Sequence, residues 1–386
     1  MRGFVGSRAS LLALGALRSA TELAATSPGP DWRLRWRELG NKLEAFESFR
    51  RAEQQARGAG RGLSLAALVE HACPLAGGRT VWMLEGLAYG YAECQWALGA
   101  PREPLGWLAG LPAGSLIALH CGAGLSLARH RLAGSARLPP AVLRRGMADH
   151  LAACRELAWP GHAPALLEAM GFIARLRFAR RAREVADALA RLDEEAHACF
   201  WHGWGRALYF LPSHALPSTG GSGKLLLAVR GAPAGECRDN ALAGLALALT
   251  LVNLRHPQVL AELLHRRGGE LGVEDPAFAH GVGSAILVWH DCVPDDPWLA
   301  RWRGYRPVLA GSELAWLWER QVSGPAETAL AGEGGRVPIG EGLGDLFRYR
   351  ARSPGEKSGD LVAEQSVFPA RRADASPAAP RAYLQR

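Results

Sequence analysis

The sequence predicts an all-α protein whose tandem helical hairpins, each about 39 residues long, form a solenoid or a closed α/α ring. Three observations lead to this prediction. Leu, Ala, Arg and Glu, which favour helices, dominate the chain, whereas the β-branched runs typical of strands are rare. A short Gly-rich motif recurs six times. Pro and Gly separate the apolar stretches between its copies.

The repeated motif reads Gly, any residue, Gly or Ala, any residue, a small residue and an apolar residue. Its lead glycines lie 36, 39, 42, 41 and 37 residues apart, at Gly86, Gly122, Gly161, Gly203, Gly244 and Gly281. A unit of this length holds two helices and a turn. Glycine inside a helix costs about 1 kcal/mol relative to alanine. We therefore interpret the lead glycines as points where two helices approach closely.

Three regions are expected along the chain. Residues 1–60 are predicted to form an N-terminal helical arm, in which a Pro- and Gly-containing break at residues 27–30 separates an apolar helix from an amphipathic one. Residues 61–323 are predicted to form the six-unit repeat domain. Residues 324–386 are rich in Gly, Pro, Ser, Ala and charge, so they are predicted to be a flexible C-terminal tail.

The composition restricts the function. The 386 residues are 48% hydrophobic, which suffices for a large core. The net charge is +8, but all except three of the 45 basic residues are arginines scattered among Glu and Asp. We interpret them as solvated helix faces and predict no nucleic-acid partner. A polyanion-binding alternative depends on Arg144 and Arg145 and on the run from Arg175 to Arg183.

The cysteines and the apolar runs indicate the compartment. Seven cysteines lie on apolar helical stretches and form no Cys-x-x-Cys pair, an arrangement typical of free thiols in a reducing, cytoplasmic compartment. Arg18 interrupts the apolar run from Leu11 to Leu17, and no clean cleavage site follows, so we expect no secretory signal. No window reaches the roughly 18 apolar residues that a transmembrane segment requires.

Three of the units resemble those of a bacterial family. The family is domain of unknown function family 1702. Its unit Glu-Gly-Ala resembles Glu85–Ala88, and its unit Gly-Ala-Gly-Trp-Ala-Leu-Ala-Arg resembles Cys121–Arg129. Its unit Gly-x-Gly-Arg-Ser-Leu-Trp-Phe resembles Gly203–Phe210, and the three units occur in the same order in the family. The resemblance covers about residues 40–310. Members of that family are similar to accessory proteins encoded beside enediyne polyketide synthases. The resemblance therefore implies a role in specialised metabolism and no established reaction.

The chain departs from this family in three units. Where the third unit of the family reads Asp-Gly-Tyr-Gly-Phe-His, the chain has Pro160-Gly-His-Ala-Pro164. Before the glycines of the fourth and sixth units the family has an acidic residue or Gln, and this chain has His202 and His280. These differences identify the chain as a divergent member with an altered role, if those positions carry the family's function.

Residues at or near the lead glycines are the candidates for chemistry. In a closed ring, equivalent positions face the same direction, so six side chains would line one cavity: Glu85, His120, His162, His202, Arg206 and His280. They would act there as acids, bases or ligand-binding groups. The alternative is that they cap helix starts, occupy small polar pockets or form internal ion pairs.

No cofactor is predicted. The clusters His197–His202 and His290–Cys292 lack the ligand spacing of a zinc site, so no metal is expected. The sequence also contains no complete phosphate-binding loop and no dinucleotide fingerprint.

Two functions remain open. One is an accessory scaffold or carrier that binds partner proteins or an apolar polyketide-derived intermediate, for which the 13 tryptophans would provide apolar surface. The other is an enzyme that acts on a polyene or polyketide-derived substrate in a ring cavity through Glu85, Arg206 and the repeat histidines. We prefer the scaffold because no complete catalytic set is recognisable.

Overall fold

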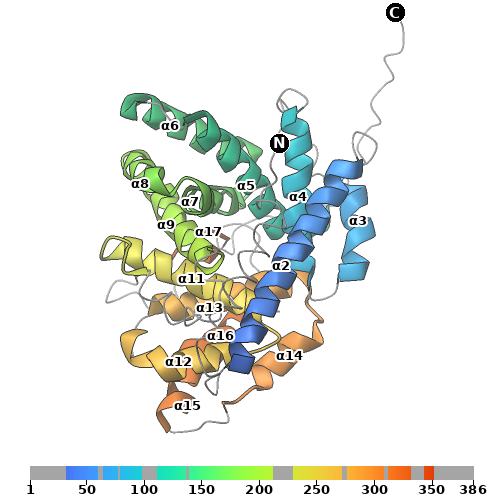
Figure 1. The fold of residues 1–386 in the computed structure, drawn as a ribbon, viewed down its shortest axis with the longest axis vertical. Coiled ribbons are helices and arrows are strands. Elements are labelled where there is room, and N and C mark those ends of the chain that lie inside the picture. Colours follow the sequence, from blue (N-terminus) through green and yellow to red (C-terminus); the bar gives the residue numbers. More distant parts are fainter. Residues whose placement is uncertain are drawn as a thin grey trace, which may run out of the picture. The chain divides into compact units, whose positions relative to one another are not determined.

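The computed structural model describes residues 32–59, 64–76, 79–97, 111–135, 139–211, 229–271, 276–307, 312–331 and 343–351. Within these ranges the protein is helical and contains no strand, which confirms the predicted all-α class (Figure 1). None of the helices in these ranges is long and apolar enough to cross a membrane. Residues 1–31 of the expected arm and residues 352–386 of the expected tail lie outside the described part of the chain.

One set of helices, here called the central helices, contact one another in chain order. They are α2 (Trp32–Ala59), α4 (Thr80–Ala97), α5 (Leu116–Ser135), α7 (Ala163–Arg177), α9 (Glu194–Tyr209), α11 (Glu236–Asn253) and α13 (Pro276–Cys292). Except for the amphipathic α2, they are buried on most sides; in α11, each residue from Asn240 to Asn253 is buried. Such all-round burial places the core of the protein between the central helices.

Other helices connect or flank the central ones. They are α3 (Leu65–Ala76), α6 (Pro140–Leu157), α8 (Ala182–Ala190), α12 (Gln258–Leu271), α14 (Pro297–Gly304) and α15 (Ser312–Trp318), with single 3-10 turns at Ala113–Ser115 and Ala179–Arg181. These helices are amphipathic. In α8, Val185 and Leu189 are buried, while Arg183 and Asp187 are exposed and paired at 3.3 Å. The connecting helices thus cover the core with one face and meet solvent with the other.

The lead glycines lie at the crossings between central helices. A Cβ atom added to Gly122 would collide with the carbonyl oxygen of Glu85 on α4, and one added to Gly281 with the carbonyl oxygen of Ala243 on α11. The second glycine of a Gly-x-Gly pair faces the next helix instead. A Cβ atom on Gly124 would lie 2.9 Å from the Cα atom of Leu166 on α7. Residues two apart lie on nearly opposite sides of a helix, so the pair lets both neighbours approach closely.

The third unit is not where the sequence motif placed it. Gly161 has a φ of 81° and lies in the turn before α7, so the prediction of a packing glycine there was wrong. Gly203 faces the carbonyl oxygen of Glu168, just as Gly244 faces that of His202, and Gly171 faces α9. The third unit is therefore Glu168-Ala-Met-Gly171 on α7, with alanine in the lead position.

The ordered domain continues past the expected boundary at residue 323. Residues 312–331 are helical throughout: a π-helical turn (Glu319–Ser323) joins α15 to α16 (Gly324–Ala331). In that turn the Gly324 N–H donates to the carbonyl of Glu319, five residues earlier, a wider turn that suits the missing N–H of Pro325. The helix α16 packs on α13, and the compact unit extends to Tyr349.

Candidate functional site

A buried polar cluster occupies the centre of the protein, where α4, α7 and α9 meet. One nitrogen of Arg206, Nη2, pairs with Oε1 of Glu85, and Nη1 donates to Oε2 of Glu168 at 3.2 Å. The Nδ1 atom of His202 lies 3.4 Å from Oε1 of Glu168. All four residues are at most 5% exposed. The structure thus brings together three of the six predicted site residues and adds Glu168.

The parallel packing of the central helices explains why these side chains meet. Glu85, Glu168 and His202 each precede the lead position of their unit, and the central helices run parallel, so equivalent positions face the same interior. Arg206 follows His202 by one helical turn on α9. Cys121 is the equivalent residue on α5. Burial raises the pKa of its thiol, which also interacts electrostatically with Arg206 and Glu85. The cluster is therefore built from equivalent positions on neighbouring central helices.

Burial controls the electrostatics of the cluster. It raises the pKa of Glu85, whereas the neighbouring Arg206 acts to lower it. Burial acts to lower the pKa of Arg206, but the two carboxylates outweigh burial and raise that pKa. The guanidinium carbon also lies 4.9 Å from the centre of the Phe172 ring. Arg206 thus remains charged and serves as the shared counter-ion of two carboxylates.

His280 lies on the far side of His202. Its Nε2 atom is 2.7 Å from the carbonyl oxygen of Asp345, which belongs to α17 (Leu343–Leu346). Burial lowers the pKa of His280, and His202 acts in the same direction. The ring of Phe347 packs edge-on against His202 at 6.0 Å between ring centres. His280 is therefore held by the C-terminal segment rather than by Arg206.

His120 and His162 form a separate pair. Their rings stack with centres 4.6 Å apart. The Trp159 N–H donates to Nε2 of His120 at 3.0 Å, so the proton of this imidazole is on Nδ1, which donates to the Leu116 carbonyl at 2.6 Å. His162 bonds the carbonyl of Pro160 at 3.0 Å. The two rings link α5 to the turn before α7. In the described contacts, neither ring bonds to Arg206.

These buried imidazoles predict a pH-dependent stability. Burial lowers the pKa of His120 to about 3, so its neutral form stabilises the fold above pH 6.5 and this stability is lost as the pH falls from 6.5 toward 3. We expect His120→Gln to reduce the pH slope of the unfolding free energy below pH 6.5 by up to about 1.4 kcal/mol per pH unit. Urea unfolding between pH 7 and pH 5 measures the slope. The control is His71→Gln at an exposed site; equal slopes for both variants would contradict the assignment.

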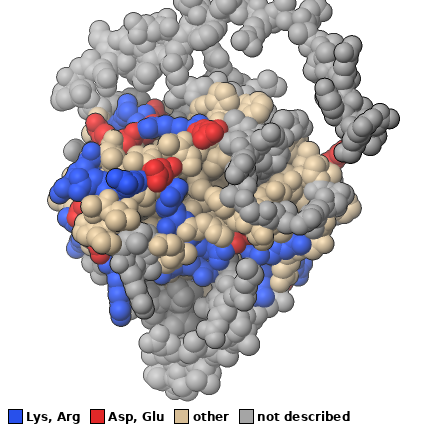
Figure 2. All heavy atoms as spheres, turned by 90° about the horizontal axis from the view of Figure 1, so that it is seen from above, with Lys and Arg blue, Asp and Glu red and all other residues tan. Residues whose placement is uncertain are grey.

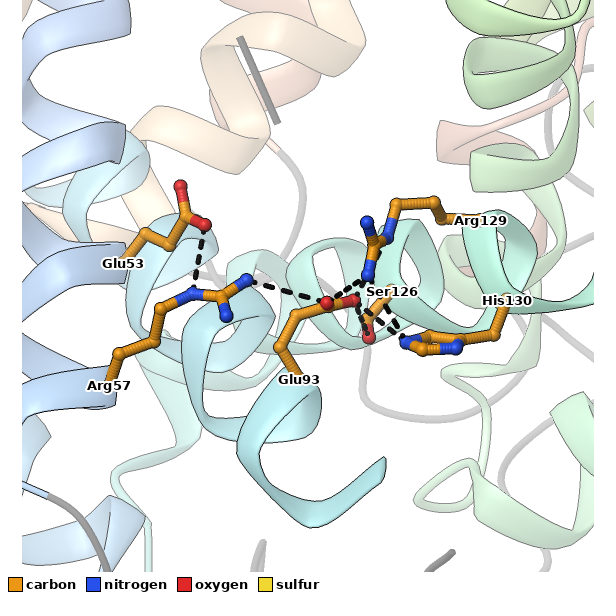
Figure 3. A network of polar contacts seen from close by, with 6 residues as sticks. All are labelled: Glu53, Arg57, Glu93, Ser126, Arg129 and His130. Atoms are coloured by element: carbon orange, nitrogen blue, oxygen red, sulfur yellow. Dashed lines mark hydrogen bonds and ion pairs between the residues drawn. The ribbon is translucent and has the colours of Figure 1, made fainter. Parts of the chain in front are cut away.

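A second polar network joins α2, α4 and α5 (Figure 3). The buried carboxylate of Glu93 accepts from Ser126 at 2.7 Å and from Nη2 of Arg57 at 3.4 Å, and it also pairs with Arg129. The Nε2 atom of His130 lies 3.1 Å from the same carboxylate. Arg57, Arg129 and His130 are 26–37% exposed along their side chains. The network thus links a buried carboxylate to cations at the surface.

The sequence contains a signal for this network that a search of the lead glycines does not detect. Glu93 lies 36 residues after Arg57 and 36 residues before Arg129, which is close to one repeat. Opposite charges at the repeat spacing are brought side by side when successive units stack in parallel.

Arginines spread over the face of the molecule that lies at the top of Figure 1. Figure 2 views this face and shows more basic than acidic surface among the residues drawn in colour. Several of the arginines that supported the polyanion alternative are paired locally: Arg181 with Glu184 at 2.7 Å and Arg183 with Asp187 at 3.3 Å. Such pairs are typical of solvated helix faces.

Two of the tryptophans line a pocket where α2, α4, α11 and α13 meet. Its walls are Trp82, Trp289, Leu251 and Val252, and its polar rim is Asn41, Glu44, Arg79 and Arg255. Glu44 pairs with Arg79 at 2.8 Å and with Arg255 at 3.2 Å. The pocket is small and mixed in polarity, and it lies apart from the Arg206 cluster.

Comparison with family models, with curated proteins and with solved structures finds no match to this chain. Among the described side chains, no three His, Cys, Asp or Glu residues are placed to hold a metal ion. The described cysteines are free thiols.

Proposed function

We propose that this chain is an accessory scaffold protein of enediyne-type polyketide metabolism, in which helical-hairpin repeats close into a ring and bind partner proteins. Contacts between distant units support the ring: Arg206 on α9 meets Glu85 on α4. Asn41 on α2 also donates to Asn253 on α11 at 2.9 Å. An open solenoid, in which each unit touches only its neighbours, would not make these contacts.

We propose that the chain is not a catalyst because Glu85 and Glu168 share Arg206 as their counter-ion. A carboxylate that acts as an acid or base must reach its substrate. Here Glu85 and Glu168 both bond Arg206 in a layer that is almost inaccessible to solvent. Removing such charges from water is tolerated only when they neutralise one another. The cluster therefore acts as an internal ion network that fixes the positions of α4, α7 and α9.

The family context depends on the repeat units. The segment Gly203–Phe210 supports this context, and so does the segment Glu168-Ala-Met-Gly171-Phe172 on α7. The second segment matches the family's third unit, Asp-Gly-Tyr-Gly-Phe, in its acidic residue, its second glycine and its phenylalanine. This segment fits the family unit better than Pro160–Pro164 does.

One observation favours the enzyme alternative. Among the described residues, the Nε2 atom of His202 is buried without a hydrogen-bond partner. This nitrogen could bind a substrate group only if the side chains that bury it moved aside. The alternative requires that the purified chain convert a polyene or polyketide-derived substrate and that His202→Gln abolish the conversion.

Affinity purification from the native host tests the scaffold proposal. A tagged chain, mildly cross-linked in cells, is expected to recover proteins encoded beside a polyketide synthase, or a lipophilic polyketide-derived molecule. Mass spectrometry of the eluate identifies both, and an unrelated tagged helical protein from the same host defines the background. An eluate that matches the background contradicts the proposal.

A further inference from the structure

The C-terminal segment 343–350 lies against the central helices in the way that a bound peptide does. In Figure 1, α17 lies beside α7. From this single turn onward, the segment inserts the Phe347 ring, which is 2% exposed, next to His202. The Tyr349 ring then packs against His280 at 5.6 Å. A segment with almost no secondary structure of its own thus places one buried and one partly buried aromatic ring against the central helices.

The central helices hold the backbone of this segment directly. Asn240 of α11 pairs with both polar backbone groups of Tyr349: its Nδ2 donates to the carbonyl at 3.1 Å, and its Oδ1 accepts from the N–H at 2.7 Å. His280 of α13 bonds the carbonyl of Asp345 at 2.7 Å. Hydrogen bonds to main-chain groups give affinity for an extended peptide whatever its side chains, as in strand addition.

Side-chain contacts add a sequence preference. Glu195 at the start of α9 pairs with Arg348 at 3.2 Å. This charge lies between the sites for Phe347 and Tyr349, so the surface selects an aromatic residue, an arginine and a second aromatic residue in succession.

The segment has little regular structure of its own. Its only helix, α17, has four residues, too short to be stable by itself. It also lies at the end of the compact unit, which closes at Tyr349. Elements with few anchors open locally at a lower free energy than the whole fold.

We propose that α9, α11 and α13 form a groove for extended peptides with the pattern aromatic-Arg-aromatic, and that residues 343–350 are its resident occupant. A partner protein that carries such a segment displaces them. This inference rests on the proposed scaffold function and names the partner class: a protein with an exposed aromatic-Arg-aromatic segment.

Peptide binding in trans tests the groove. The probe is a fluorescein-labelled peptide with the sequence of residues 343–351, and the proteins are full-length chains. Phe347→Asp weakens the resident segment and leaves the groove intact, so we expect this chain to bind the peptide at least tenfold more tightly than the unmodified chain. Adding Asn240→Ala should reduce that binding at least tenfold. A peptide with Asp in place of its Phe is the matched control, and equal binding of both peptides overturns the proposal.

A measurement on the unmodified chain covers the case in which Phe347→Asp fails to fold. Amide hydrogen exchange of residues 343–350 should be faster than that of α9 and α11, and excess isotope-labelled peptide should accelerate it at least threefold. Unchanged exchange at saturating peptide overturns the proposal. Failure of the peptide experiments while partners still co-purify rejects only the groove, whereas peptide binding without native partners rejects only the scaffold function.

Discussion

Gly203→Ala is expected to destabilise the fold by about 3 kcal/mol or more, at the upper end of overpacking substitutions. The added Cβ would collide with the carbonyl oxygen of Glu168 and lie 3.0 Å from the backbone nitrogen of Phe172. Both atoms belong to the backbone of α7, which is buried and packed on both sides. The methyl group therefore cannot be accommodated by a side-chain rotation, and two helices must separate. Urea unfolding followed by circular dichroism measures the loss.

Two other glycines provide matched controls. A Cβ on Gly40 or Gly58 of α2 would have no atom within 4 Å. Replacing these helical glycines by alanine is expected to stabilise the protein by up to about 1 kcal/mol each, because alanine has the higher helix propensity. If Gly203→Ala and Gly58→Ala change stability in the same direction, the close helix crossing is not a source of stability.

The motif search found most of the close helix crossings but not the reason why one of them lacks a lead glycine. Where α5 crosses α7, one of the two facing residues must lack a side chain for the helices to approach closely. Gly124 is that residue, because a Cβ atom there would lie 3.0 Å from the Cβ of Ala169. The lead position on α7 can therefore be alanine, and a pattern that requires glycine selects Gly161 in the turn instead. Which of two facing residues must be small depends on the helix pair, not on either sequence segment alone.

The candidate site could be predicted only in part, for a related reason. Glu85 and His202 were found because each precedes a lead glycine, and Glu168 was missed because its unit was displaced. Arg206 and Glu85 are 121 residues apart. They pair only if the row of central helices curves back far enough, and the spacing of the motif does not specify this curvature. The C-terminal segment was missed because its composition resembles a flexible tail, whereas its order comes from contacts with α9, α11 and α13.

Arg206→Met is expected to cost about 3–5 kcal/mol of unfolding free energy at pH 7, the usual loss when one partner of a buried ion pair is removed. Methionine is apolar and of similar length, so packing against Phe172 is largely kept, while Glu85 and Glu168 lose their shared counter-ion. The difference between the variant and the unmodified chain should come from charge, and urea unfolding at several pH values measures it.

The pH dependence identifies the cause. Burial already raises the pKa of Glu85, and Arg206 is the group that acts to lower it; without Arg206 this pKa rises further. A carboxyl whose pKa is raised in the folded state adds stability below its ordinary pKa of 4.5 and loses it as the pH rises through the raised value. The deficit of Arg206→Met should therefore shrink as the pH falls toward 4.5. Protonation of His120 weakens both chains alike and cancels in the difference.

A triple variant separates an internal ion network from a ligand site. Glu85→Gln, Glu168→Gln and Arg206→Met together remove every charge of the cluster at nearly constant volume, and buried ion pairs replaced in this way often leave stability unchanged or increased. We expect the triple variant to recover most of the loss at pH 7 and to keep the partners that co-purify with the unmodified chain. If it recovers its stability but loses its partners, the cluster takes part in partner binding. If it instead loses a conversion of a polyketide substrate that the unmodified chain performs, the cluster acts on a ligand and the enzyme alternative replaces the scaffold.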